Sequence, residues 1–363
     1  MKITLFSFDT QVQPTYDSDS IDRLRYYFTV LVLVACSGFI MLKQYVGESL
    51  QCWAPKQFKG GWEQYAETYC LIENTYYVNM NASNLPGQGS RENNELRYYQ
   101  WVPFILGGMA LALYIPRFIW RLLQSFIGID ISIVTSFLRK NAKSNLVSNC
   151  DVEKHRAKME KKKPKTYIDK KKEGEFWGSK LTICLIITKV LSFLSILITM
   201  IFMDYFMGLG PAYGWTVTKD LIAGRQWQES GTFPRVTFCD FQIRELGYVN
   251  NWSLQCVLMV NMFNEKLFIA LWWWYIVLAV LSIYDIVRFF FRFTAFHQIR
   301  FISMILNTIE NDDVSSIETT EFNRKVLKND GINLVHLVYS NATIFEAADF
   351  VKPLWNNYKN SKL

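Results

Sequence analysis

Four cysteines are the residues of this chain best placed to form covalent bonds, and they occur as two spaced pairs. Cys52 and Cys70 are separated by 17 residues, and Cys239 and Cys256 by 16 residues. In an oxidising compartment such thiols form disulfides, which typically stabilise a fold by about 2–5 kcal/mol and hold the joined segments rigid. Four cysteines allow three pairings, and their spacing does not choose among them.

Four long apolar runs separate and position these cysteines, at residues 26–42, 102–126, 181–206 and 267–291. A helix rises about 1.5 Å per residue, so about 20 apolar residues cross a hydrocarbon core of about 30 Å. The stretch from 181 to 203 carries one charge, Lys189, which favours membrane spans over four buried helices of a soluble domain. The sequence therefore predicts an all-α membrane protein with four transmembrane helices.

The distribution of charge predicts the orientation of these spans. Residues 117–180 contain 16 Lys and Arg against 7 Asp and Glu, whereas residues 45–100 contain 4 against 6 and residues 204–266 contain 5 against 6. Positively charged loops stay in the cytoplasm, so both cysteine-bearing loops are expected outside and both termini inside. The basic loop could also bind anionic membrane lipids, whereas nucleic acid is not an expected partner because topology explains the charge.

This topology divides the chain into nine segments. We expect a cytoplasmic amino-terminal segment at 1–22, transmembrane helices at 23–44, 102–126, 181–206 and 267–291, extracellular loops at 45–101 and 207–266, a cytoplasmic loop at 127–180 and a cytoplasmic helical domain at 292–363. The first span is expected to act as its own insertion signal, because no cleavable signal peptide precedes it. The cysteines outside the two pairs are predicted to be free thiols: Cys36, Cys150 and Cys184.

One heptapeptide at the start of the second span carries a family resemblance. The residues Tyr98-Tyr99-Gln100-Trp101-Val102-Pro103-Phe104 resemble the signature of the innexins, the invertebrate gap-junction proteins. Further matches surround the cysteines, at Gln44–Gly47, Cys52–Pro55, Phe233–Phe241, Gln255–Leu258 and Asn261–Lys266. The resemblance extends from about Asp17 to the end of the fourth span. The chain departs from the family at Met259, where a proline is usual.

The resemblance implies a channel subunit with disulfide-bridged extracellular loops, pairing Cys52 with Cys256 and Cys70 with Cys239. Innexin subunits form a ring, here expected to be a homo-oligomeric octamer, with rings mixed with other innexins as an alternative. Such a hemichannel lies in the plasma membrane and can dock with one of an adjacent cell at a gap junction. Ions and small metabolites then pass between the two cytoplasms.

In this family the amino-terminal segment folds toward the pore, which gives its acidic residues two interpretations. Asp9, Asp17 and Asp19 are pore-lining candidates, since rings of carboxylates favour cations. Alternatively, the aspartates next to the first span only cap its helix. Lys189 is likewise open, as an intramembrane functional charge or as a lysine that reaches back to the interface.

Two glycosylation motifs fall in the predicted extracellular loops, at Asn81 and Asn251. Glycans there would hinder docking and favour an undocked channel; the alternative is that the sites are unused or point sideways.

The main rival from another class is a four-span adhesion or barrier protein without a pore. The innexin signature argues against it. An enzyme is not expected, because the three histidines (His155, His297 and His336) lie far apart in sequence and no catalytic, metal-binding or cofactor motif occurs.

Overall fold

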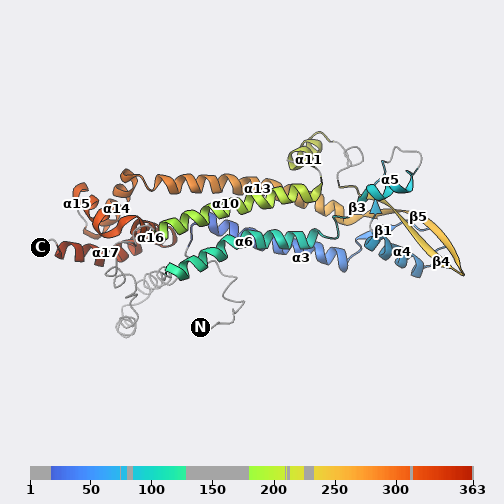
Figure 1. The fold of residues 1–363 in the computed structure, drawn as a ribbon, viewed down its shortest axis with the longest axis horizontal. Helices are drawn as coiled ribbons and strands as arrows, with labels where there is room; N and C mark the ends of the chain where they lie inside the picture. The colour runs from blue at the N-terminus through green and yellow to red at the C-terminus, as the bar shows by residue number, and fades with distance from the viewer. Residues whose placement is uncertain are drawn as a thin grey trace, which may run out of the picture. The chain divides into compact units, whose positions relative to one another are not determined.

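The computed structural model describes residues 18–73, 75–79, 85–127, 180–208, 210, 213–224, 233–310 and 314–361 (Figure 1). The chain forms two compact units. The first comprises the described parts of residues 1–29, 113–195 and 280–363, and the second those of residues 30–112 and 196–279. Each of the four long helices contributes one portion to each unit.

The four predicted spans are continuous helices. The first consists of α2 (Ser20–Arg23), the π-helical turn η1 (Leu24–Thr29) and α3 (Val30–Tyr45), and the others are α6 (Val102–Ile127), α10 (Lys180–Met207) and α13 (Met259–Phe291). All four are long and apolar enough to cross a membrane. The prediction of a mainly helical protein with four spans is therefore confirmed.

Helix α13 begins at Met259, well before the apolar run that starts at residue 267. Two polar side chains of its first turns are paired: Asn261 accepts a hydrogen bond from the Tyr98 hydroxyl at 2.9 Å, and Glu265 pairs with Arg235 at 3.0 Å. The amide nitrogen of Met259 donates to the Ser49 carbonyl at 3.1 Å, a bond that the proline usual in the family could not make. Hydropathy detects only the apolar part of this helix.

Two prolines lie in α6 with different local consequences. Pro103 occupies the first turn, where the amide has no partner within the helix in any case, and its carbonyl accepts a hydrogen bond from Ser37 of α3 at 2.7 Å. Pro116 lies inside the helix, which continues past it to Ile127.

A five-stranded antiparallel sheet, which the sequence pattern did not predict, forms part of the second unit. Its order is β1-β5-β4-β2-β3, with β1 Leu50–Cys52, β2 Thr75–Tyr76, β3 Glu95–Leu96, β4 Val236–Glu245 and β5 Tyr248–Leu258. Strands β4 and β5 form a long hairpin, turned by Leu246 and Gly247 with φ of 46° and 90°. Two positive φ values in a two-residue loop match the right-handed twist of the flanking strands.

Among the residues that the structure describes, the second unit has three further helices: α4 (Gly60–Glu73), α5 (Gln88–Asn93) and α11 (Tyr213–Ile222). Helix α11 packs tightly against α13. A Cβ added at Gly214 would lie 2.3 Å from the indole ring of Trp272, so only glycine fits there. The Tyr213 hydroxyl also donates to the Phe268 carbonyl at 3.1 Å. The resulting cover leaves Trp272 buried.

The segment after α13 forms five helical pieces of the first unit. They are α14 (Ala295–Glu310), α15 (Ser316–Phe322), the π-helical turn η4 (Asn323–Leu327), α16 (Lys328–Asn341) and α17 (Ile344–Asn360). Their shared core includes Ile302, Phe322, Val335, Val351 and Trp355, all almost completely buried. The segment 292–363 thus has the helical character that the sequence predicts. Most of the predicted cytoplasmic loop lies outside the described residues.

Candidate functional site

Two disulfides tie the sheet of the second unit together with the pairing that the family resemblance implied. Cys52 bonds to Cys256, which faces it in the β1–β5 register, and Cys70 of α4 bonds to Cys239 of β4. Both bonds join the segment between the first two spans to the segment between the last two. Cys36 and Cys184 are free thiols, as predicted, and Cys150 lies outside the described residues.

The signature residues Tyr99 and Gln100 support the end of helix α4. The side-chain amide of Gln100 donates to the carbonyls of Leu71 and Ile72 at 2.7 and 2.9 Å, and the Tyr99 hydroxyl donates to the Leu71 carbonyl at 3.2 Å. The last carbonyls of a helix have no partner within it. The signature therefore completes the carboxyl end of α4, the helix that also carries Cys70.

Tyr98 links the signature to the start of the fourth span. Its hydroxyl donates to Asn261, and the amide of Asn261 donates to the Pro234 carbonyl at 2.9 Å. Burial raises the pKa of Tyr98 above its ordinary value, and it raises the pKa of Tyr99 to about 12. Both hydroxyls therefore stay protonated and able to donate. The signature therefore connects the end of α4 to the start of α13 within the second unit. Its residues Val102 and Pro103 begin α6.

Asp240 of β4 binds side chains from β2 and α5. It accepts hydrogen bonds from the Tyr76 hydroxyl at 3.0 Å and from Arg91 at 2.8 Å. Arg91 also donates to the Pro86 carbonyl at 2.6 Å. Burial and the Asp240 carboxylate raise the pKa of Tyr76 to about 12. The hydrogen bond to Asp240 raises the pKa of Arg91. Polar bonds thus reinforce the disulfide-linked sheet.

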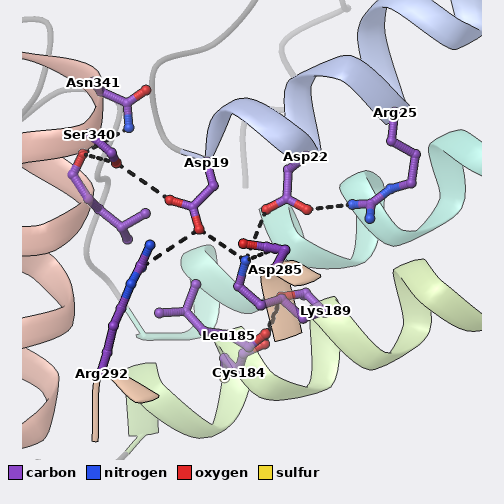
Figure 2. A network of polar contacts seen from close by, with 12 residues as sticks. Asp19, Asp22, Arg25, Cys184, Leu185, Lys189, Asp285, Arg292, Ser340 and Asn341 are labelled. Atoms are coloured by element: carbon purple, nitrogen blue, oxygen red, sulfur yellow. Dashed lines mark hydrogen bonds and ion pairs between the residues drawn. The ribbon is translucent and has the colours of Figure 1, made fainter. Parts of the chain in front are cut away.

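A second polar constellation lies in the first unit, and we call it the charge cluster (Figure 2). It comprises three carboxylates and three cations: Asp19, Asp22, Asp285, Lys189, Arg25 and Arg292. Lys189 of α10 is at its centre, with its ammonium 3.0 Å from Asp19, 3.6 Å from Asp22 and in direct contact with Asp285 of α13. The formal charges of these six residues sum to zero.

The cluster settles how Lys189 is accommodated. Lys189 is 6% exposed, so in this structure it does not extend toward solvent as a snorkelling lysine would. Burying one charge alone is very costly, whereas a compensated set of charges is tolerated. The carboxylates of Asp19, Asp22 and Asp285 are close enough to hold a metal ion, but the Lys189 ammonium already contacts all three. The cluster is therefore a buried ion-pair network that joins the start of the first span to α10 and α13.

Within this cluster Asp19 contacts Arg292, and it also connects the cluster to helix α16. Arg292, just after α13, approaches it at 3.8 Å, and the Ser340 hydroxyl of α16 lies 3.5 Å from its second oxygen (Figure 2). Asp19 occupies the N-cap position of α2, yet its side chain makes no capping hydrogen bond there. Its carboxylate bonds across the fold instead, so the capping interpretation does not describe Asp19.

Helix α16 also binds the start of the third span. Asp330 accepts hydrogen bonds from the amide nitrogens of Leu181 and Thr182 at 3.2 and 2.9 Å. Asn333 donates to the Thr182 hydroxyl at 2.8 Å. Free amides at a helix start favour an acidic acceptor, and here another helix supplies it. Nothing in the local sequence marks Asp330 for this role, because its partners are about 150 positions away.

The remaining predicted site residues have varied placements. Asp9, Asp17 and Asn81 lie outside the described residues. Asn251 is exposed on β5, opposite Gln242 of β4. Sequence reasoning missed Asp285 and Ser340 as partners of the amino-terminal region. The only feature of the sequence that indicated such partners was Lys189, because a buried lysine needs carboxylates to balance its charge.

Comparison with known proteins agrees with these features. The sequence profile of the innexin family matches residues 18–358. Over 363 residues the chain is 67% identical to Innexin-17 of Caenorhabditis elegans, covering all of both chains. It is 40% identical to Innexin-16 of the same organism, over 94% of this chain and 89% of that one. It is 34% identical to Innexin unc-9 of that organism, over 100% and 98% of the two chains.

Four apolar helices, with a disulfide-linked sheet built from the segments that connect them, define a multi-pass membrane protein. The chain belongs to the innexin family. Innexins are channel proteins of plasma-membrane gap junctions and are not enzymes.

Proposed function

We propose that this chain is a subunit of a large-pore channel, in which eight copies form a ring around a central pore. The channel passes ions and small metabolites, and both termini of each subunit face the cytoplasm. The observation that carries this proposal is the innexin match over residues 18–358, which includes both disulfides and the charge cluster. Rings of identical subunits are the simplest assembly, and rings mixed with other innexins are the alternative.

The disulfide-linked sheet supports docking between hemichannels. Two covalent bonds and the Asp240 contacts make it a stiff element, and rigid surfaces lose little entropy when they bind a partner. The tip of the β4–β5 hairpin exposes apolar side chains: Leu246 is fully exposed, Tyr248 largely exposed and Val249 half exposed. Exposed apolar groups at one tip favour contact with another protein surface.

The glycosylation motif at Asn251 favours the undocked form. Asn251 is exposed on the same hairpin, a few residues from its tip. A glycan on this side chain would occupy space that an opposing hemichannel needs. A hemichannel that works alone in the plasma membrane is therefore the specific alternative to a gap-junction channel.

Acidic residues near the amino terminus support a preference for cations. The charge of Asp19 is balanced by Lys189 and Arg292 in this conformation, so the acidic pore lining that we propose rests chiefly on Asp9 and Asp17. Carboxylates repeated around a ring would attract cations to the pore mouth. Asp9→Asn should shift the reversal potential in a salt gradient toward lower cation preference, and an unchanged potential would contradict this role.

Subunit counting and permeation together test the proposal. Purified protein should give two-dimensional class averages of a ring with eight subunits. Single cells that express the chain should take up a small fluorescent dye, and paired cells should exchange it if hemichannels dock. Asn251→Gln should increase exchange between paired cells while uptake by single cells stays unchanged.

Matched variants separate a pore from a protein that only adheres cells. Cys52→Ser combined with Cys256→Ser should abolish dye exchange, whereas Cys36→Ser, which alters a free thiol, should not. Monomeric protein, or cells that adhere to each other without dye uptake or current, would favour the adhesion or barrier alternative.

A further inference from the structure

Helix α16 is attached at its two ends to two different spans. Near its start, Asp330 and Asn333 bind the first residues of α10. Near its end, Ser340 lies beside Asp19, directly before α2. Ser340 lies ten positions after Asp330 in the helix, a distance of about 15 Å at 1.5 Å per residue. One rigid helix therefore relates the beginning of the first span to the beginning of the third.

The two attachments differ in strength. Asp330 is 9% exposed and accepts three hydrogen bonds, two from amides and one from the Thr182 hydroxyl. The Ser340 residue is exposed, and its hydroxyl is 3.5 Å from Asp19 and 3.2 Å from the Leu337 carbonyl. The Asp330 contact anchors α16, whereas the Ser340 contact is long and only partly buried. Charge can be added at Ser340 without burying it.

The charge cluster makes Asp19 sensitive to such a change. Asp19 is held by Lys189 and Arg292, within a set of three carboxylates and three cations. A negative group at position 340 would repel the Asp19 carboxylate and attract Arg292, because charges in a partly buried site are weakly screened. A positive group would strengthen the hold on Asp19. The two signs should therefore act in opposite directions on the start of the first span.

We propose that helix α16 positions the start of the first span through Asp19, and that the charge balance around Asp19 sets how readily the channel opens. Ser340, Lys189 and Arg292 are positioning residues in this arrangement. The inference rests on the proposed channel function. It adds that the carboxy-terminal helices control the channel through a specific contact with the first span.

The test measures the whole-cell hemichannel current of charge variants at Ser340. The variants are compared at equal amounts of channel protein on the cell surface. Ser340→Asp and Ser340→Lys should change the current at least threefold, in opposite directions. Ser340→Asn has nearly the same shape as the Asp variant and should stay within twofold of the unmodified chain. Ser361→Asp adds the same charge to an exposed serine just after α17 and should likewise have little effect.

A double-mutant cycle assigns the effect to Asp19. In the Asp19→Asn background, Ser340→Asp should no longer change the current beyond its Ser340→Asn control. The thermal unfolding midpoint of the purified protein should report the same coupling, with Ser340→Asp lowering it only when Asp19 is present. A merely structural role of α16 would not produce opposite effects of the two signs.

The outcomes separate this inference from the function on which it rests. A conducting unmodified chain whose current is the same with Asp, Lys and Asn at position 340 would overturn the inference and leave the channel proposal intact. A charge effect that persists without the Asp19 carboxylate would also overturn it. An unmodified chain that reaches the surface but carries neither current nor dye would overturn both.

Discussion

Asp330 caps helix α10 from a helix that lies about 150 residues later in the chain, through its contact with Thr182. One carboxylate oxygen accepts hydrogen bonds from both the Thr182 amide, at 2.9 Å, and the Thr182 hydroxyl, at 2.7 Å. The carboxy-terminal helices thus complete the third span, so stability of the span and docking of α16 should be coupled.

Removal of this cap should destabilise the first unit. Asp330→Ala leaves buried amides of α10 without an acceptor, which should cost about 1–3 kcal/mol. Asp330→Asn keeps one acceptor oxygen and should cost less. Thermal unfolding of the purified protein measures both, and Asp349→Asn, on an exposed residue of α17, is the matched control. Equal midpoints for the Ala variant and the control would contradict the capping role.

Loss of the central cation should disrupt the charge cluster. Lys189→Met leaves Asp19 and Asp285 buried without their main counter-charge, and breaking a buried ion pair in this way costs about 3–5 kcal/mol. The yield of folded oligomer and its thermal midpoint should both fall. Adding Asp285→Asn should recover part of the loss, because one unpaired charge is removed. Lys352→Met, at an exposed position, should change neither quantity.

Gly214 should tolerate no side chain. A methyl group there would overlap the Trp272 ring, so Gly214→Ala should cost about 1–3 kcal/mol through forced repacking. Gly61→Ala meets no atom within 4 Å and serves as the control. Differential thermal unfolding compares the two variants. If the Ala variants at both positions unfold at the same temperature, α11 does not pack on α13 in this way.

His336 should remain neutral at physiological pH. It stacks on Phe301 with ring centroids 3.6 Å apart, and burial with the charges of Arg292 and Arg288 lowers its pKa to about 3. Asp19 opposes this shift. The unfolded chain therefore binds the proton more readily, so the contribution to stability is full above pH 6.5 and declines as pH falls toward 3.

The measurement for His336 is the thermal midpoint at pH 7.5 and pH 5. His336→Phe keeps an aromatic ring beside Phe301 and should lose less stability on acidification than the unmodified chain. Any response of the current between pH 7.5 and pH 6.5 should persist in this variant. Identical acid sensitivity of the two midpoints would show that His336 does not contribute.

The sequence predicts the helical frame well, because hydropathy is a local property. Apolar runs located all four spans, although the polar start of α13 from Met259 was missed because Asn261 and Glu265 bind partners that lie outside this helix. The sheet was missed for a similar reason. Strands β1, β2 and β3 have two or three residues each and exist only through pairing with the β4–β5 hairpin or with each other.

For the candidate sites too, the sequence identified single residues but not their distant partners. The disulfide pairing followed from family resemblance, since spacing alone allowed three solutions. Lys189 was recognised as unusual, but its partners Asp19 and Asp285 are 170 and 96 residues away. A charged residue within an apolar run indicates that it has partners of opposite charge, but only the fold determines which carboxylates these are.

The disulfide connectivity also constrains how the protein is made. Cys52 and Cys256 are 204 positions apart and Cys70 and Cys239 are 169 apart. If both cysteine-bearing loops face outward, as in the proposed topology, the first two thiols enter the lumen of the secretory pathway long before their correct partners have been translated. They are each other's nearest oxidation partner in that interval. Native maturation therefore requires that they be kept reduced, or reshuffled by an isomerase, until the ribosome has released most of the chain.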